Sequence, residues 1–166
     1  MSAYELAQLN IGIIRGPMDS PVMAEFAANL ARINALADAA SGFVWRLQTE
    51  SGDATAIRPF DDPDMLLNMS VWRDLESLRQ YVYASAHVEI MRRRREWFAR
   101  MDEAYLVLWW VPRGHRPSIA EALARLAALR ARGAHPEAFT FRAHYPPPDA
   151  DPGESPGVIG EECPAL

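Results

Sequence analysis

Residues 66–72 read LLNMSVW, with a polar or amphipathic side chain at every second position. Alternation with a period of two predicts a β-strand whose two faces differ. Two further segments, 3–14 and 43–48, alternate in the same way. A sheet face that carries amides, a guanidinium and indoles is unusual for a core and common in a pocket wall. The sequence therefore predicts a sheet that lines a cavity.

The segments around this stretch predict an α+β protein. Strands are expected at 3–14, 43–48, 65–72, 105–111 and, at an edge, 139–141, with helices at 21–40, 74–82, 85–101 and 118–132. Ser118 and Glu121 form a capping box, which is the clearest helix start in the chain. The order β-α-β-β-α-β with an extra C-terminal helix is the ferredoxin-like split βαβ plan, in which helices cover one face of an antiparallel sheet.

Strand parity sorts the side chains into two faces. The apolar set is expected under the helices: Leu9, Ile11, Leu67, Met69 and Val71. The alternate set is expected on the uncovered face: Gln8, Asn10, Arg46, Asn68, Ser70 and Trp72, with one of Trp109 and Trp110. Too many apolar residues share this second face for it to be simply solvated, so a second subunit is expected to bury it. The pattern predicts a homodimer with a closed, partly polar cavity in each half.

Composition excludes several classes of function. A net charge of −5 argues against binding to nucleic acid or to an anionic membrane surface. All 17 basic residues are arginine, which excludes a lysine Schiff base. Cys163 is the single cysteine, so no internal disulfide or cysteine-cluster metal site is expected. Without a secretory leader or an apolar run of about 18 residues, we expect a cytoplasmic protein.

The length of 166 residues suits one domain and a tail. We expect the domain to span residues 1–142. From residue 143 the chain becomes rich in proline, so residues 143–166 are predicted to be a disordered tail.

With this order of elements the chain resembles the dimeric α/β-barrel superfamily, which includes antibiotic-biosynthesis monooxygenases and haem-degrading monooxygenases. The finer resemblance, over about residues 3–142, is to a bacterial family known as domain of unknown function 3291. The segments that carry it lie at 4–10, 42–47, 68–72, 85–98 and 106–112. It implies a homodimeric α/β barrel and, if the protein is an enzyme, oxygen-dependent oxidation.

The haem-degrading members of this superfamily imply roles for two residues. Asn10 stands where those enzymes keep a catalytic asparagine, and His87 lies in the region of their haem-ligating histidine. Their helix tryptophan, ten positions before that histidine, corresponds to Ser77, and the nearest aromatic residue is Tyr81. This departure weighs against haem degradation. It leaves cofactor-free oxygenation of a phenolic or enolate substrate, or a different haem reaction.

Each candidate residue also has a purely structural interpretation. His87 is expected on the apolar face of its helix. It could act as a general base or haem ligand, or it could be a packed histidine. Asn10, Asn68 and Ser70 could orient a substrate carbonyl or oxyanion, or bond to one another. Arg46 could hold a carboxylate, or pair with Glu5 or Glu50.

The aromatic and remaining candidates also have two interpretations, and the structural one is favoured. Trp72 could stack on a flat ligand or fill an interface. Gln8 and Tyr81 complete the expected substrate-binding set. The run 92–95 is entirely arginine and has the charge spacing of a solvated helix face. No spacing of histidines indicates a metal site.

Three hypotheses follow for function. The first is a homodimeric monooxygenase-like enzyme acting on a small aromatic or planar molecule, with His87 as base or axial ligand and either no cofactor or haem. The second is a non-catalytic protein that binds a small molecule or haem in the same cavity. The third is a structural dimer whose polar strand residues satisfy one another.

Overall fold

The computed structural model describes residues 1–84 and 87–158, while the side chains of Ala84 and His87 lie outside this description. Predictions that concern the His87 side chain or Cys163 therefore fall outside the described part. The elements run β1 (Tyr4–Ile13), α1 (Ala24–Asp38), β2 (Phe43–Arg46), β3 (Met65–Trp72), α2 (Leu75–Ala84), α3 (His87–Arg92), α4 (Arg94–Trp97), β4 (Leu106–Pro112), α5 (Ile119–Arg132), β5 (Ala143–His144) and β6 (Gly157–Val158).

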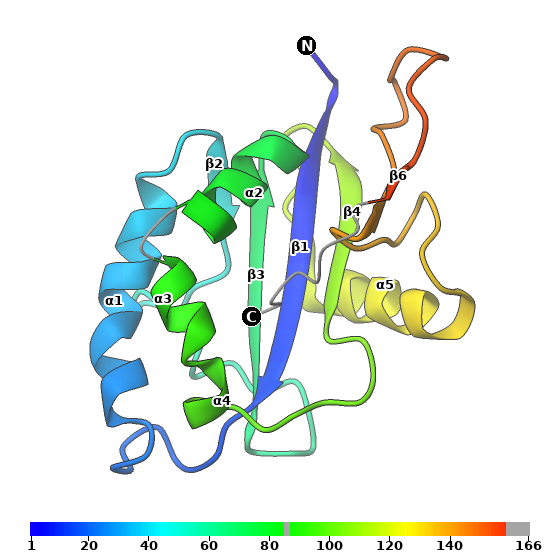
Figure 1. Cartoon of the computed structure of the whole chain (residues 1–166). Coiled ribbons are helices and arrows are strands. Elements are labelled where there is room, and N and C mark those ends of the chain that lie inside the picture. Colours follow the sequence, from blue (N-terminus) through cyan, green and yellow to red (C-terminus); the bar gives the residue numbers. More distant parts are fainter. Residues whose placement is uncertain (85–86, 159–166) are drawn as a thin grey trace.

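The four main strands form one antiparallel sheet in the order β2-β3-β1-β4 (Figure 1). This order places the two central strands, β1 and β3, beside each other although a helix and a strand separate them in sequence. It confirms the α+β, ferredoxin-like split βαβ fold with an extra C-terminal helix. Within the described residues, no helix is long and apolar enough to cross a membrane.

Local signals explain where the helices begin and end. The Ser118 side chain accepts a hydrogen bond from the backbone N–H of Glu121 at 3.1 Å, which confirms the predicted start of α5. Gly133, at φ 74°, ends the same helix as expected. Ser20 instead bonds to the Pro17 carbonyl at 2.5 Å and closes a turn, so α1 begins later than predicted.

The predicted helix at 85–101 is broken into α3 and α4 and ends early. Phe98 is extended, at φ −120° and ψ 138°, and forms a bridge with Ile14 beside the end of β1. The backbone N–H of Ala99 donates to the Ile13 carbonyl at 2.8 Å. Pairing with β1 therefore replaces the last turn of the expected helix.

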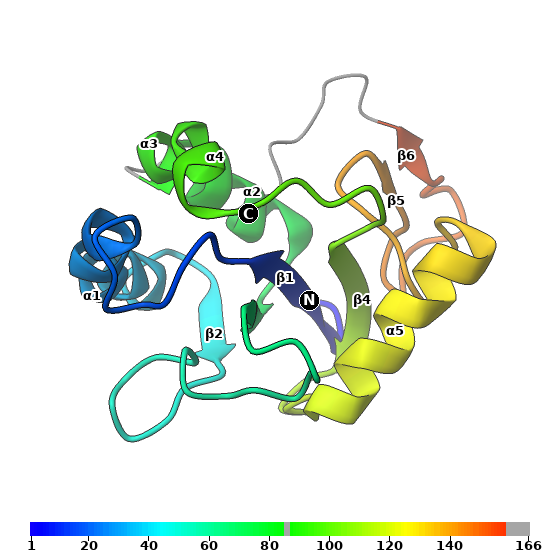
Figure 2. The ribbon, with the colours of Figure 1, turned by 90° about the horizontal axis from the view of Figure 1, so that it is seen from below.

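Parity sorted the side chains into the correct two faces, but the elements predicted to cover each face were wrong. α2, α3 and α4 lie over one face, while α5 and the loop after β2 lie over the other (Figure 2). The apolar set packs against Ala122, Leu126 and Leu129 of α5. The polar set faces α1, α2 and α3. The prediction that the polar face lies uncovered is wrong because one chain supplies helices to both faces.

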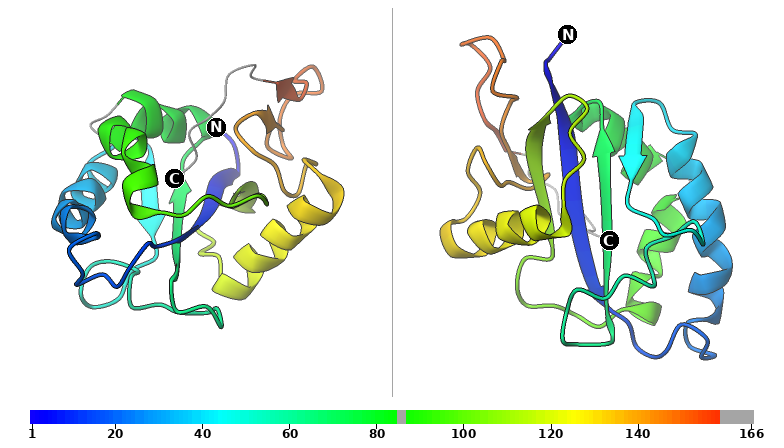
Figure 3. Two further views of the ribbon diagram at one scale, coloured as in Figure 1. Left: turned by 60° about the horizontal axis from the view of Figure 1, so that its bottom comes forward. Right: turned by 180° about the vertical axis from the view of Figure 1, so that it is seen from behind.

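This arrangement removes the observation on which the expected homodimer rested. Ser70 and Trp72, on the face that a second subunit was expected to bury, are buried under α1–α4 of the same chain, and α5 lies over the opposite face (Figure 3). Among the described residues, the exposed large apolar side chains are scattered: Met1, Val22, Tyr83 and Val158. In the described part of the chain, both faces of the sheet are therefore covered without a partner.

Residues 143–158, which the sequence assigned to a disordered tail, contain two short strands. Residues 143–158 form a hairpin in which β5 pairs with β6. The Asp149 carboxylate accepts hydrogen bonds from the Ser2 hydroxyl at 2.7 Å and the Ala3 backbone N–H at 2.6 Å. Phe139 pairs with Leu108 through two backbone hydrogen bonds of 2.8 Å, so the expected edge strand is a single bridge beside β4.

Candidate binding pocket

A pocket of about 140 Å³ lies between the sheet and the helices α1–α4. Its floor is the polar face of β1 and β3, and its roof is made of side chains from the helices. Six of the predicted strand candidates line it: Gln8, Asn10, Arg46, Asn68, Ser70 and Trp72. The pocket is contained in one chain, whereas the sequence predicted a cavity closed by a second subunit.

One group of polar residues in the floor is bonded together. The Gln8 amide nitrogen donates to Asn68 Oδ1 at 2.6 Å and to Ser70 Oγ at 3.0 Å. The Trp72 indole nitrogen donates to the same Ser70 oxygen at 2.8 Å. Ser70 Oγ thus accepts two hydrogen bonds, and its hydroxyl hydrogen remains a donor. Asn68 is exposed and therefore lies at the mouth of the pocket.

Asn10 differs from these neighbours because its amide nitrogen has no partner. The residue is 4% exposed, sits between Asn68 on β3 and Leu106 on β4, and lines the pocket. Asn10 Nδ2 is the one buried side-chain nitrogen or oxygen in the described part of the chain without a hydrogen bond. Leaving such a donor unpaired costs about 1–3 kcal/mol. The pocket therefore holds an unsatisfied donor that a ligand oxygen could bind.

Tyr81 of α2 also lines the pocket, as the sequence predicted. Its hydroxyl donates to the Ile33 carbonyl of α1 at 3.2 Å. Burial raises the pKa of this hydroxyl, which keeps it neutral. Tyr81 is therefore suited to shape the wall and unsuited to act as a base.

Arg46 lines the pocket but is occupied by the protein itself. Its guanidinium pairs with Asp38 through Nε at 2.8 Å and Nη2 at 3.2 Å. Nη1 donates to the Gly52 carbonyl at 2.6 Å. The sequence suggested Glu5 or Glu50 as the alternative partner, and Asp38 takes that place because the end of α1 packs beside β2.

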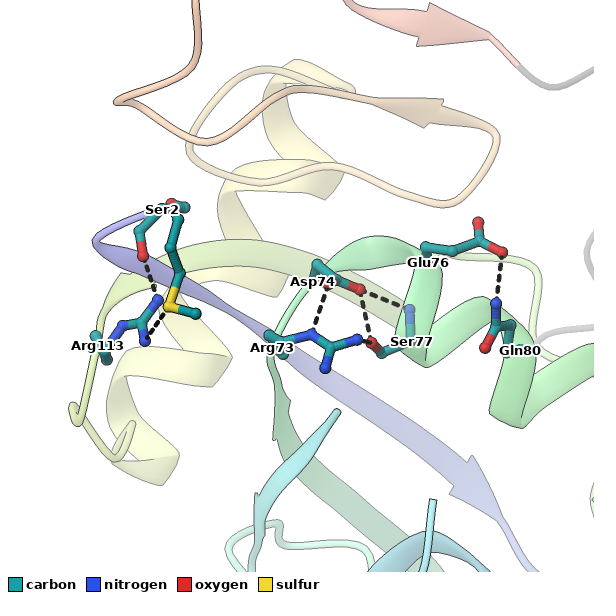
Figure 4. A network of polar contacts seen from close by, with 8 residues as sticks. Ser2, Arg73, Asp74, Glu76, Ser77, Gln80 and Arg113 are labelled. Carbon is teal, nitrogen blue, oxygen red and sulfur yellow. Dashed lines mark hydrogen bonds and ion pairs between the residues drawn. The ribbon is translucent and has the colours of Figure 1, made fainter. Parts of the chain in front are cut away.

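Ser77, at the position of the haem-degrading tryptophan, belongs to the start of α2. The Asp74 Oδ1 atom accepts from both the backbone N–H and the hydroxyl of Ser77, each at 2.7 Å, and Arg73 donates to Ser77 Oγ at 3.1 Å (Figure 4). Asp74 thereby caps the helix as expected. Ser77 is not among the residues that line the pocket.

Neither tryptophan of the β4 pair lines the pocket, although the sequence placed one of them there. Trp109 is fully buried on the α5 side, and its indole nitrogen donates to Glu121 Oε1 at 3.0 Å. Trp110 shares the parity of the pocket face, but its indole donates to the Tyr145 carbonyl at 2.8 Å. The segment after α5 covers it.

Sequence reasoning missed Arg94. This residue lines the pocket from α4, although the run of four arginines reads as a solvated helix face. That interpretation holds for Arg93, which pairs with Glu96 at 2.7 Å and with Glu25 of α1. The signal that separates Arg94 from its neighbours is the break in the helix before it, which the sequence did not reveal. His87 begins α3, and its predicted role stays a prediction because its side chain lies outside the description.

These features define a ferredoxin-like α+β protein with an intrachain pocket. The chain belongs to the family described as domain of unknown function 3291, which matches residues 5–155. No curated protein matches the sequence.

Solved structures with a similar fold include SnoaB, a cofactor-independent oxygenase from Streptomyces nogalater. It is 20% identical over 70% of this chain and 98% of its own, with a TM-score of 0.47. Rv0793 from Mycobacterium tuberculosis is 14% identical over 69% of this chain and 99% of its own, with a TM-score of 0.46. NE2512, a protein of unknown function from Nitrosomonas europaea, is 14% identical over 70% and 95%, with a TM-score of 0.44.

Proposed function

We propose that this chain binds a small planar molecule through an acceptor oxygen on that molecule. Where the bound molecule is electron-rich, the chain oxygenates it. The observation that carries the proposal is the unpaired Asn10 Nδ2 atom inside the pocket. Folded proteins pair more than about 90% of their buried polar groups. A carbonyl, enolate or phenolate oxygen of a ligand would supply the missing acceptor.

The size and walls of the pocket support a planar ligand. An enclosed cavity of about 150 Å³ is enough to bind benzene, and this pocket is of about 140 Å³. Trp72 and Tyr81 present aromatic surface to it. One ring therefore fits inside, and a second ring could extend toward the mouth at Asn68.

The same donors could support oxygenation. Hydrogen bonds from Asn10 Nδ2 and the Ser70 hydroxyl would stabilise an enolate or phenolate and so lower the pKa of the bound substrate. The electron-rich anion can pass electrons to O2. A CH2 group then becomes C=O, one oxygen atom enters the product and the other leaves as water with the two hydrogens. The substrate supplies all four electrons, so no external reductant is needed. His87 is the proposed base.

Haem does not fit the same space. A tetrapyrrole is far larger than the single ring that the enclosed volume accepts, so lining side chains would have to move. We expect added haemin to give no ligated Soret band. A Soret shift that His87→Ala abolishes would overturn this part of the proposal.

The binding step is tested with 2-naphthol and naphthalene, which share a skeleton and differ in one oxygen. We expect calorimetry to show that the wild type prefers 2-naphthol by about tenfold, which is the value of one hydrogen bond to a buried donor. Asn10→Leu, which has nearly the same shape, should remove the preference and retain naphthalene. Equal binding of both compounds by the wild type would contradict the proposal.

The chemical step is tested with 1,3-indandione, a planar compound whose CH2 lies between two carbonyls. We expect uptake of one O2 for each indane-1,2,3-trione formed, with no added reductant. Asn10→Leu and His87→Ala should both lower the rate. Binding of 1,3-indandione without any oxygen uptake would reject oxygenation and leave the non-catalytic binding protein.

A further inference from the structure

Arg94 is a half-buried cation in the wall of the pocket. Its guanidinium carbon lies 4.7 Å from the centroid of the Tyr105 ring and 5.1 Å from that of Phe98. Two aromatic faces thus hold the group in one place. A guanidinium held this way is oriented before any ligand arrives.

The position of Arg94 along the pocket follows from its aromatic neighbours. A Cβ atom at Gly12 would lie 2.6 Å from Phe98 Cδ1, so the Phe98 ring covers this end of β1. The backbone N–H of Ile11 donates to the Tyr105 carbonyl at 2.9 Å. Arg94, packed on both rings, therefore lies at the Gly12 end of the floor. Asn10 precedes Gly12 by two residues on β1, so it faces the same side, and their Cα atoms are about 7 Å apart along the strand.

Arg94 lacks a counter-ion of the kind that Arg93 and Arg46 have. Arg93 pairs with Glu25 and Glu96, and Arg46 pairs with Asp38. No carboxylate lies within ion-pair distance of Arg94 in the described part of the chain. Asp53 also lines the pocket, but its Oδ1 atom accepts from the backbone and hydroxyl of Thr55 at 2.8 and 2.6 Å.

A half-buried charge without a counter-ion is unfavourable. Burial lowers the pKa of Arg94, because the charged form has lost part of its hydration. A carboxylate bound to the guanidinium would compensate for the lost hydration through paired, charge-assisted hydrogen bonds. The pocket thus presents one unpaired buried donor, at Asn10, and one cation without a carboxylate partner, at Arg94.

We infer that the ligand is an aromatic carboxylate, whose carboxylate binds Arg94 while a second oxygen on the ring system binds Asn10. This inference rests on the proposed function and names the class of ligand for the same pocket. It also sets the orientation, since the carboxylate lies at the Gly12 end and the ring system extends toward Trp72.

A different role for Arg94 would be packing alone, with its flat guanidinium filling the space between two rings. The two roles differ in one measurable respect. A packing residue would not distinguish an anionic probe from a neutral one of the same shape.

The test compares 2-naphthoate with 2-naphthamide, which is neutral and nearly isosteric. We expect the wild type to prefer 2-naphthoate by about tenfold or more in calorimetry. Arg94→Met should abolish that preference and leave the affinity for 2-naphthamide within a few fold. Arg95→Met, which removes the same charge from the exposed neighbouring position, should keep the preference.

The outcomes separate this inference from the proposed function. Equal binding of the two probes by the wild type overturns the role of Arg94 and leaves the pocket intact, and this comparison needs no variant to fold. A preference that survives in Arg94→Met also overturns it. Failure of both probes and of 2-naphthol to bind contradicts the proposed function itself. Arg94→Lys, which keeps the charge without the planar fork, should retain part of the preference.

Discussion

Tyr81 stacks on Trp72, with ring centroids 5.0 Å apart and ring planes inclined by 26°. The two residues come from different layers, because Trp72 ends β3 and Tyr81 belongs to α2. The Tyr81 hydroxyl continues the connection to the Ile33 carbonyl of α1. This pair therefore joins the sheet to two helices at one end of the pocket.

The buried Tyr81 hydroxyl predicts a loss of stability in base. Burial raises the pKa of Tyr81 in the folded protein, whereas an unfolded tyrosine ionises near about 10. The unfolded state therefore releases this proton first, and stability is expected to fall as the pH rises above that value. Tyr81→Phe keeps the stack with Trp72. Between neutral and strongly alkaline pH, its free energy of unfolding in urea should therefore fall less than that of the wild type. Equal falls in the two proteins would contradict the burial of this hydroxyl.

Asn10→Leu should stabilise the protein while it impairs binding. The substitution removes an unpaired buried donor, so we expect the free energy of unfolding to rise by about 1–3 kcal/mol. A substitution that raises stability and weakens binding identifies a residue whose role is in the site and whose presence destabilises the fold. Denaturant unfolding measures the change, and Gln8→Leu is the matched control. Gln8 is hydrogen-bonded, so its loss should destabilise the protein. Destabilisation by Asn10→Leu would show that Asn10 supports the fold.

Gly12→Ala is expected to displace Phe98. The new methyl group would lie 2.6 Å from Phe98 Cδ1, closer than real atoms approach. Overpacking of this kind costs about 1–3 kcal/mol. Because Arg94 rests on the Phe98 ring, binding of 2-naphthoate should weaken more than binding of naphthalene. Gly153→Ala, where no atom lies within 4 Å of the added carbon, is the control and should leave both properties unchanged.

Asp74→Ala, which removes the cap of α2, should lower the free energy of unfolding by about 0.5–2 kcal/mol. Burial alone would raise the pKa of Asp74, but hydrogen bonds from Ser77 and Arg73 outweigh it and lower the pKa. Stability from this group is therefore present above the unfolded pKa of about 3.9 and is lost as the pH falls through the lower folded value. Asp74→Asn should flatten that acid dependence in urea unfolding. Glu76→Gln, an exposed carboxylate in the same first turn, should not.

The strands were predictable because their signal is local. Alternation over residues 66–72 placed β3 to within a residue, and Ser118 with Glu121 marked the start of α5. The covering of each face was not predictable, because both faces are buried and parity does not say which helix lies above which set. Asn10 was identified as a candidate, but its lack of a partner depends on neighbours from β3 and β4. Arg94 was missed because its environment arises only where the chain breaks between α3 and α4.

The helix α5 makes the burial of the sheet's apolar face a property of one chain. Burial shared between subunits follows mass action, so it weakens on dilution, whereas burial within a chain does not. We therefore expect the thermal midpoint to stay constant over roughly a hundredfold range of protein concentration. A midpoint that rises steadily with concentration would show that a second chain contributes to the folded core. The protein should thus keep its pocket at any dilution, because α5 is covalently attached to the sheet it covers.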